Sequence, residues 1–123
     1  MLEKIIGGQL LSIDKEKIVI KKDNQVYVLD IIIKDDGDCC GYSKVKTLLI
    51  DKKEISKNPI ITRVQVTEND YGWCDIATLT LFGLNKELAK IESESGSDSG
   101  WCYGACVTIE CKALRIKKKL SAW

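Results

Sequence analysis

The chain has 123 residues, of which 45% are apolar and 30% charged, and its net charge at pH 7 is +1. This length and composition indicate one compact globular domain spanning residues 1–123 and exclude an intrinsically disordered chain. The near-zero charge argues against a strongly basic nucleic-acid binder and against a strongly acidic nucleic-acid mimic.

The N-terminal segment, MLEKIIGGQLLSI, lacks the basic start and unbroken apolar core of a signal peptide. No run approaches the ~18 apolar residues that a membrane-spanning helix needs. We therefore expect a cytosolic protein without a membrane partner. Its six cysteines should stay reduced in that compartment.

Two apolar, β-branched runs in the first third predict a β-hairpin. They are QLLSIDKEKIVI at 9–20 and VYVLDIII at 26–33, and the polar turn between them contains Asp23-Asn24. Ile18 and Ile20 share one face of the first arm, as the alternation of a strand requires.

The next two segments are less regular. Residues 35–42, DDGDCCGY, predict a loop. Residues 43–55, SKVKTLLIDKKEI, suit either a short amphipathic helix or an alternating strand, and a helical or irregular turn is favoured. Asn58-Pro59 ends this segment, because proline restricts the residue before it.

The second half predicts further strands. IITRVQV at 60–66 and DIATLTLFG at 75–83 are strand-like, with turn residues between them. Residues 84–91 suit a helical turn or an edge strand, and the strand is favoured because so short a helix is marginal. GACVTIECKALRIKKK at 104–119 alternates most clearly, with Val107, Ile109, Cys111 and Ala113 on one face.

The predicted fold class is therefore a β-rich α+β single domain. It consists mainly of an antiparallel sheet of about six strands, with at most one or two short helices. Residues 112–123 form its basic C-terminal strand end or tail. The cations of this segment are Lys112, Arg115, Lys117, Lys118 and Lys119. A solvated strand edge is the favoured interpretation, and phosphate contact is the alternative.

The sequence contains no histidine. This removes the commonest general acid/base and excludes a Cys-His or Ser-His nucleophile pair within the chain. No carboxylate pair has a spacing that singles it out. We therefore expect no enzymatic activity, no catalytic residue and no cofactor.

Three interpretations of the cysteines stay open: reduced thiols, which are favoured, a cysteine-rich metal site, and disulfide or redox use. Cys102, Cys106 and Cys111 have spacings within the range of zinc sites. Strand alternation nevertheless places Cys106 and Cys111 on opposite faces, with Cys111 among the core residues. No metal ligand is assigned. The cysteines are Cys39, Cys40, Cys74, Cys102, Cys106 and Cys111.

Aromatic residues concentrate in three glycine-containing segments. GDCCGY ends with Tyr42, NDYGWCD contains Tyr71 and Trp73, and GSDSGWCYG contains Trp101 and Tyr103. These rings either plug the ends of a small sheet or form a ligand or protein surface from convergent loops. The predicted binding residues are Asp38, Tyr42, Trp73, Asp75, Ser99, Trp101 and Tyr103.

The polar run SESGSDSG at 93–100 also has two interpretations. It is either a mobile hairpin tip, which is favoured, or a set of hydroxyl and backbone N–H groups that engages a phosphate or another polar partner.

The order of these features resembles a small family of uncharacterised phage and prophage proteins. The resemblance rests on the N-terminal G-G-x-L, the GDCCGY loop, the T-L-F-G strand and SGSDSGWCYGACVTI, and it covers roughly residues 5–112. That family pairs a GDCC loop with a later S-x-G-Y-Y-G-like segment, which Trp101-Cys102-Tyr103-Gly104 replaces here.

The resemblance implies a β-rich fold and a mobile-element setting, but no activity. By analogy with other small phage proteins, we expect a non-enzymatic counter-defence inhibitor in the cytoplasm of an infected or lysogenic bacterial host. Its partner would be a host immune protein or a nucleotide-like signal. The alternatives are a cysteine-rich zinc-binding structural module and a nucleic-acid accessory protein that uses the basic C-terminus. Homo-oligomerisation stays open.

Overall fold

The computed structural model describes residues 2–34, 41–72, 74–97 and 104–123. Within these ranges the chain forms nine strands, a 3-10 turn and a short α-helix. The elements are η1 (Leu2–Ile5), β1 (Gln9–Ile13), β2 (Lys17–Lys22), β3 (Gln25–Lys34), β4 (Gly41–Ile50), α1 (Lys52–Ile55), β5 (Arg63–Asp70), β6 (Cys74–Gly83), β7 (Lys86–Ser97), β8 (Cys106–Cys111) and β9 (Ile116–Ala122).

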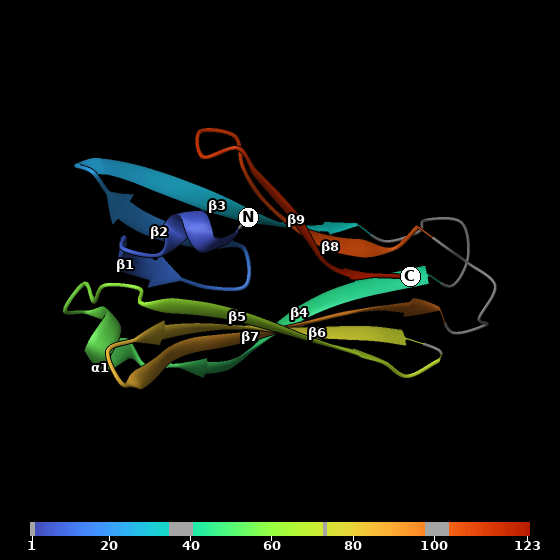
Figure 1. The fold of residues 1–123 in the computed structure, drawn as a ribbon. Helices are drawn as coiled ribbons and strands as arrows, with labels where there is room; N and C mark the ends of the chain where they lie inside the picture. The colour runs from blue at the N-terminus through green and yellow to red at the C-terminus, as the bar shows by residue number, and fades with distance from the viewer. Residues whose placement is uncertain (1, 35–40, 73, 98–103) are drawn as a thin grey trace.

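The strands make two antiparallel sheets that lie face to face (Figure 1). Sheet A has the order β1-β2-β3-β8-β9, and sheet B has the order β4-β7-β6-β5. The predicted fold class, a mainly antiparallel β-rich domain with short helices, is confirmed. The strands are more numerous than the six expected. None of the helices formed by the described residues has the length and apolar character that a membrane crossing requires.

One apolar core fills the space between the sheets. Sheet A contributes Ile18, Ile20 and Leu29, and sheet B contributes Leu79 and Ile91, all at most 1% exposed. Burying each such side chain contributes about 1.5–3 kcal/mol to folding, so this core dominates the stability. The alternation predicted for Ile18 and Ile20 is confirmed.

The first hairpin forms where the sequence predicts it. Asp23 and Asn24 both have positive φ, 53° and 63°, as the tight turn between β2 and β3 requires. Residues 9–20 are not one arm, however. They fold back at residues 14–16 into β1 and β2, and the Asp14 carboxylate accepts hydrogen bonds from Glu16 N and Lys17 N in that turn.

The preference for a helix or irregular turn over 43–55 is wrong for most of the segment. Residues 43–50 belong to β4, and only α1, which covers 52–55, is helical. The competing signal came from Leu48, which falls in an irregularity of the pairing between Thr47 and Leu49 and breaks the alternation. The preference for a strand over 84–91 is confirmed for the part within β7, but the expected edge position is wrong, because β7 pairs with β4 on one side and β6 on the other.

The C-terminal segment contains a turn that its sequence conceals. Residues 104–119 are not one strand, because Lys112–Arg115 turns the chain between β8 and β9. Val107, Ile109 and Cys111 are buried as predicted, but Ala113 lies in the turn and is exposed. Arg115 has a positive φ of 55°, a conformation that glycine or asparagine usually signals.

Serines replace the apolar core at one end of the sandwich. Ser95 of β7 lies 2.8 Å from Ser43 of β4 and 2.9 Å from Ser121 of β9 through their hydroxyl oxygens, and all three residues are buried. This serine chain links sheet B to sheet A. The interpretation of 93–97 as a mobile tip or a phosphate site is therefore wrong, because these residues form the last part of β7 and their serines are buried. Residues 98–100 lie outside the described residues.

Ser95→Ala tests this serine chain. It should lower the free energy of unfolding by about 1–3 kcal/mol, because two buried hydroxyls lose a partner. The triple alanine variant of Ser43, Ser95 and Ser121 should cost less than three times as much, because it removes the three hydroxyls together. Urea unfolding gives both values. An unchanged stability for Ser95→Ala would contradict the serine chain.

Candidate functional site

The predicted binding residues divide between described and undescribed parts of the chain. Tyr42 lies at the start of β4 and Asp75 at the start of β6. The others, Asp38, Trp73, Ser99, Trp101 and Tyr103, lie outside the described residues. The site is therefore built from the strands on either side of them.

The strand ends that flank these segments lie together. Lys34 at the end of β3 pairs with Cys106 at the start of β8, and Gly41 at the start of β4 pairs with Ser97 at the end of β7. The turn between β5 and β6 is at the same end of sheet B (Figure 1). We call this end of the sandwich the loop end.

A row of four residues crosses the face of sheet B that is turned away from sheet A at the loop end, and the two middle residues of this row, Cys74 and Gly96, are buried. Tyr71 N donates to Cys74 O at 2.9 Å, and Cys74 and Tyr42 both pair with Gly96. Directly opposed residues share a face of a sheet, so the two tyrosines flank the small residues Gly96 and Cys74. We call these four residues the tyrosine row. Gly72, with a φ of 84°, permits the tight turn that follows Tyr71.

Charged groups surround Tyr42. Its hydroxyl donates to Glu94 Oε2 at 2.6 Å, and Lys44 Nζ lies 3.6 Å from the same oxygen. Lys44 Nζ also lies 5.7 Å from the centroid of the Tyr42 ring. These contacts fix the Tyr42 ring in one orientation. Tyr71, by contrast, is 57% exposed and available to a partner.

The thiol in the tyrosine row is unsuited to nucleophilic chemistry. Cys74 is fully buried, and burial is the main cause that raises the pKa of its thiol, followed by the negative charges of Glu94 and Asp75. A hydrogen bond with Tyr42 lowers that pKa but does not reverse the shift. The thiolate is the reactive form of cysteine, so Cys74 is kept in its unreactive form.

Asp75 faces inward and ties the two sheets together. Its Oδ2 accepts a hydrogen bond from Ala122 N of β9 at 2.9 Å. The predicted polar contact residue is thus a cross-link between sheets at the loop end. One of its carboxylate oxygens is occupied by the backbone of sheet A.

The cysteines of the described ranges are dispersed. Cys74 and Cys111 are buried and Cys106 is half-buried, and Cys106 and Cys111 do lie on different faces of β8. In the described part of the chain, no group of three or more Cys, Asp or Glu side chains could hold a metal ion. Cys39, Cys40 and Cys102 lie outside it.

The basic C-terminal residues have different surroundings. Lys112 and Arg115 lie in the turn, Lys117 Nζ is 3.8 Å from Glu110 Oε1, and Lys118 lines a cleft beside Val64. Contact of these cations with phosphate stays a prediction.

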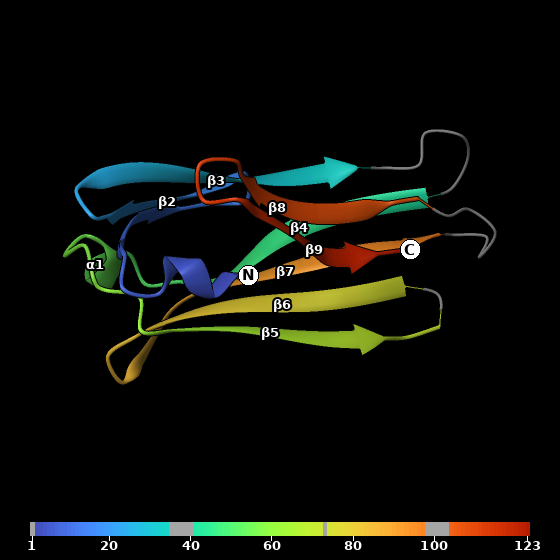
Figure 2. The same cartoon turned by 45° about the horizontal axis from the view of Figure 1, so that its top comes forward.

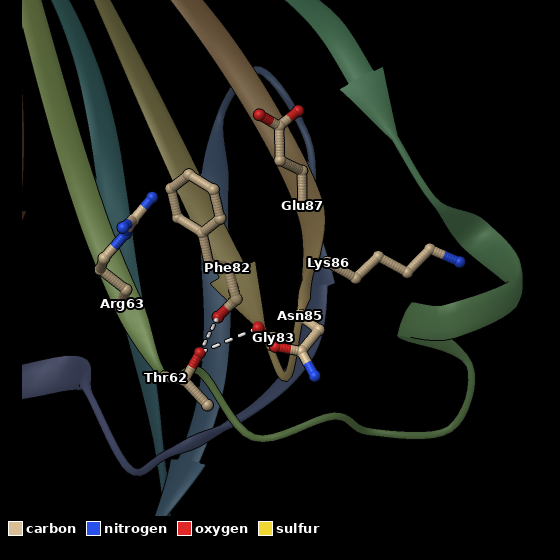
Figure 3. A pocket seen from close by; sticks show the side chains of 7 residues that line it. All are labelled: Thr62, Arg63, Phe82, Gly83, Asn85, Lys86 and Glu87. Carbon is tan, nitrogen blue, oxygen red and sulfur yellow. Dashed lines mark hydrogen bonds between the residues drawn. The ribbon is translucent and has the colours of Figure 1, made fainter.

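A cleft that the sequence did not predict lies at the opposite end of sheet B. The cleft has a volume of about 460 Å³, and Figure 3 shows Arg63, Phe82 and Glu87 beside one another on its wall. The Arg63 guanidinium carbon lies 4.0 Å from the centroid of the Phe82 ring. Thr62 Oγ1 donates to Gly83 O at 2.9 Å and fixes the floor (Figure 3).

The sequence does not predict this cleft, because the residues that line it come from separate strands and carry no motif. The register pairs Arg63 with Phe82 and Phe82 with Glu87, which brings a cation, a ring and a carboxylate into one line. Lys86 also lines the cleft, but its ammonium group lies 2.9 Å from Asp51 Oδ2 and 3.6 Å from Glu54 Oε1. The cleft is open, and its charges are of both signs.

Comparisons with known proteins gave no match: no family model, no curated protein and no solved structure matches the chain.

The ion pair between Lys86 and Asp51 beside the cleft leads to a testable prediction about the pKa of Asp51. The hydrogen bond with Lys86 is the main cause that lowers the pKa of Asp51 below its ordinary value of 3.8, and the Glu54 N–H adds to it. A lowered carboxyl pKa stabilises the fold above pH 3.8, and this contribution is lost as the pH falls through the lowered pKa. In Lys86→Met the pKa of Asp51 should rise but stay below 3.8, because the Glu54 N–H remains.

An NMR titration of the Asp51 side chain measures this shift. Lys90→Met is the matched control, because Lys90 pairs with Glu87 and not with Asp51. Equal Asp51 titration curves in the wild type and in Lys86→Met would contradict the ion pair.

Proposed function

We propose that the chain is a non-enzymatic binding protein that contacts its partner with the loop end. The observation that carries this proposal is the tyrosine row, with the exposed ring of Tyr71 at one side and the fixed ring of Tyr42 at the other. Tyrosine provides a large contact area at low entropic cost, and it recurs at the energetic centres of interfaces. Glu94 and Lys44 supply polar specificity beside it.

The spacing of the two tyrosines favours a protein partner over a nucleotide. Tyr42 lies on the edge strand β4, and Tyr71 directly follows the other edge strand, β5. Three strand spacings separate them, or about 14 Å at the backbone. A base is sandwiched only between rings that face each other, whereas the two tyrosines lie side by side on one face of sheet B. A flat protein surface can contact both at once.

The resemblance to phage and prophage proteins gives this partner a biological setting. In that setting the partner is a host immune protein, and binding blocks it stoichiometrically, without chemistry. The absence of histidine and the raised pKa of Cys74 support a role without catalysis. Sequestration of a nucleotide signal is the alternative within the same proposal.

Alanine variants at the loop end test this function. The wild-type chain, immobilised, is used to capture proteins from a lysate of the bacterial host, and panels of cyclic and linear nucleotides are tested by calorimetry. Tyr71→Ala should reduce binding at least about fivefold, because an exposed ring at an interface centre contributes more than about 1 kcal/mol. The sequence-predicted Trp101→Ala and Tyr103→Ala should do the same.

Leu84→Ala is the matched control, because Leu84 is 83% exposed in the turn between β6 and β7 at the other end of the sandwich. It should bind as the wild type does, and all variants should keep melting temperatures within a few degrees. Equal binding by the loop-end variants and the control would contradict the proposal. Unfolding of Trp101→Ala and Tyr103→Ala would show that those rings are core residues.

A further inference from the structure

Four strands lie at sheet edges: β1 and β9 in sheet A, and β4 and β5 in sheet B. An exposed edge presents unpaired N–H and C=O groups to other chains, and proteins usually protect such edges. β1 is covered by the segment after Asn58, since Leu10 N donates to Pro59 O and Ile61 N donates to Gly8 O, both at 2.8 Å.

Two of the other edges carry lysines and bulges. β4 has Lys44, Lys46 and an irregular register between Thr47 and Leu49. β9 has lysines at 117–119 and an irregular register where it pairs with Val107 and Thr108. Lysines and bulges are the usual devices against edge-to-edge pairing.

β5 lacks these devices. Its pairing with β6 runs without a bulge over all eight residues, and it contains neither lysine nor proline. Its charges lie towards its ends, with Arg63 at the start and Glu68 and Asp70 near the finish. Figure 2 shows β5 as the outermost strand of sheet B, with no strand of the described chain beyond it.

The register indicates which backbone groups of β5 point to this free edge. Tyr71 N bonds to Cys74 O, and hydrogen-bonded pairs alternate along an antiparallel ladder. The odd-numbered residues of β5 therefore bond to β6. The N–H and C=O groups of Val64, Val66 and Glu68 point away from β6.

A cleft of about 280 Å³ runs along the inner side of this edge. Its lining residues are Leu2, Glu3, Val64, Val66 and Lys118. Val64 and Val66 are only partly buried against the core. Glu68 lies on the same side of β5 by alternation, but beyond the cleft, and it is exposed.

A second copy of the chain complements this edge. If two β5 strands pair antiparallel about a twofold axis perpendicular to the sheet, like faces stay together and Val66 opposes Val66 of the other copy. Val64 then opposes Glu68 of the other copy, which brings that carboxylate to the cleft lined by Lys118 and Glu3. A parallel arrangement would instead set like charges near one another.

We infer that β5 is a dimerisation edge, through which two copies of this chain join their B sheets by antiparallel pairing centred on Val66. The result is one continuous eight-stranded sheet, because each B sheet has four strands. The antiparallel arrangement places the loop ends of the two copies at opposite ends of the dimer. Each tyrosine row is then free to bind its own partner.

Sedimentation equilibrium of the full chain over micromolar to millimolar concentrations tests this inference. The wild type should show a monomer–dimer equilibrium. Val66→Lys should raise the dimer dissociation constant at least tenfold, because two ammonium groups then oppose each other at the twofold axis. Thr47→Lys, the same substitution on the edge strand β4, is the matched control and should leave the dimer intact.

A charge exchange tests the register independently of Val66. Lys118→Glu should raise the dimer dissociation constant several-fold, and the double variant Lys118→Glu/Glu68→Lys should have the wild-type dissociation constant. A wild type that is monomeric at every concentration would overturn the inference. The inference would also be overturned if Thr47→Lys dissociates the dimer and Val66→Lys does not. The same holds if adding Glu68→Lys to Lys118→Glu fails to restore the wild-type dissociation constant. If Val66→Lys does not fold, the charge exchange decides alone.

Discussion

The connection between the two sheets at the loop end is the constraint on which the proposed site depends. Over most of the sandwich, isoleucine and leucine hold the sheets together by burial. At the loop end this role passes to the hydroxyl chain through Ser95 and to the bond between Asp75 and Ala122. Buried polar groups stabilise a structure only when they are paired, so this end has one satisfied arrangement.

That inner layer determines what the outer face presents. In β4 and β7 the strand period of two alternates Ser43 with Tyr42 and Ser95 with Gly96, so each inward serine has an outward neighbour in the tyrosine row. In β6 the inward Asp75 follows the outward Cys74 in the same way. The register that satisfies the serines therefore also aligns the tyrosines. A shift by one residue would bury the rings and expose the hydroxyls.

The sequence predicted what depends on local pattern and missed what depends on distant pairing. Asp23-Asn24 signalled a tight turn, and the fold class followed from alternation. The turn at Lys112–Arg115 contains no glycine, asparagine or proline, so the local pattern predicts strand there. Serine and glycine are turn residues, so SESGSDSG predicts a loop. Only the partners on β4 and β9 explain why its serines at 93, 95 and 97 are buried in β7. The Arg63–Phe82 stack likewise exists only in the register.

Amide hydrogen exchange by NMR tests most directly whether the loop end is built in this way. Ala122 N donates to Asp75, Trp123 N donates to Ala105 O, and Tyr71 N donates to Cys74 O. These three amides should exchange slowly, within about two orders of magnitude of the core amide of Ile109. Ala122 should lose its protection in Asp75→Ala, while Ile109 keeps its own. Rapid exchange of all three amides in the wild type, beside a protected Ile109, would contradict an ordered loop end and the binding surface proposed on it.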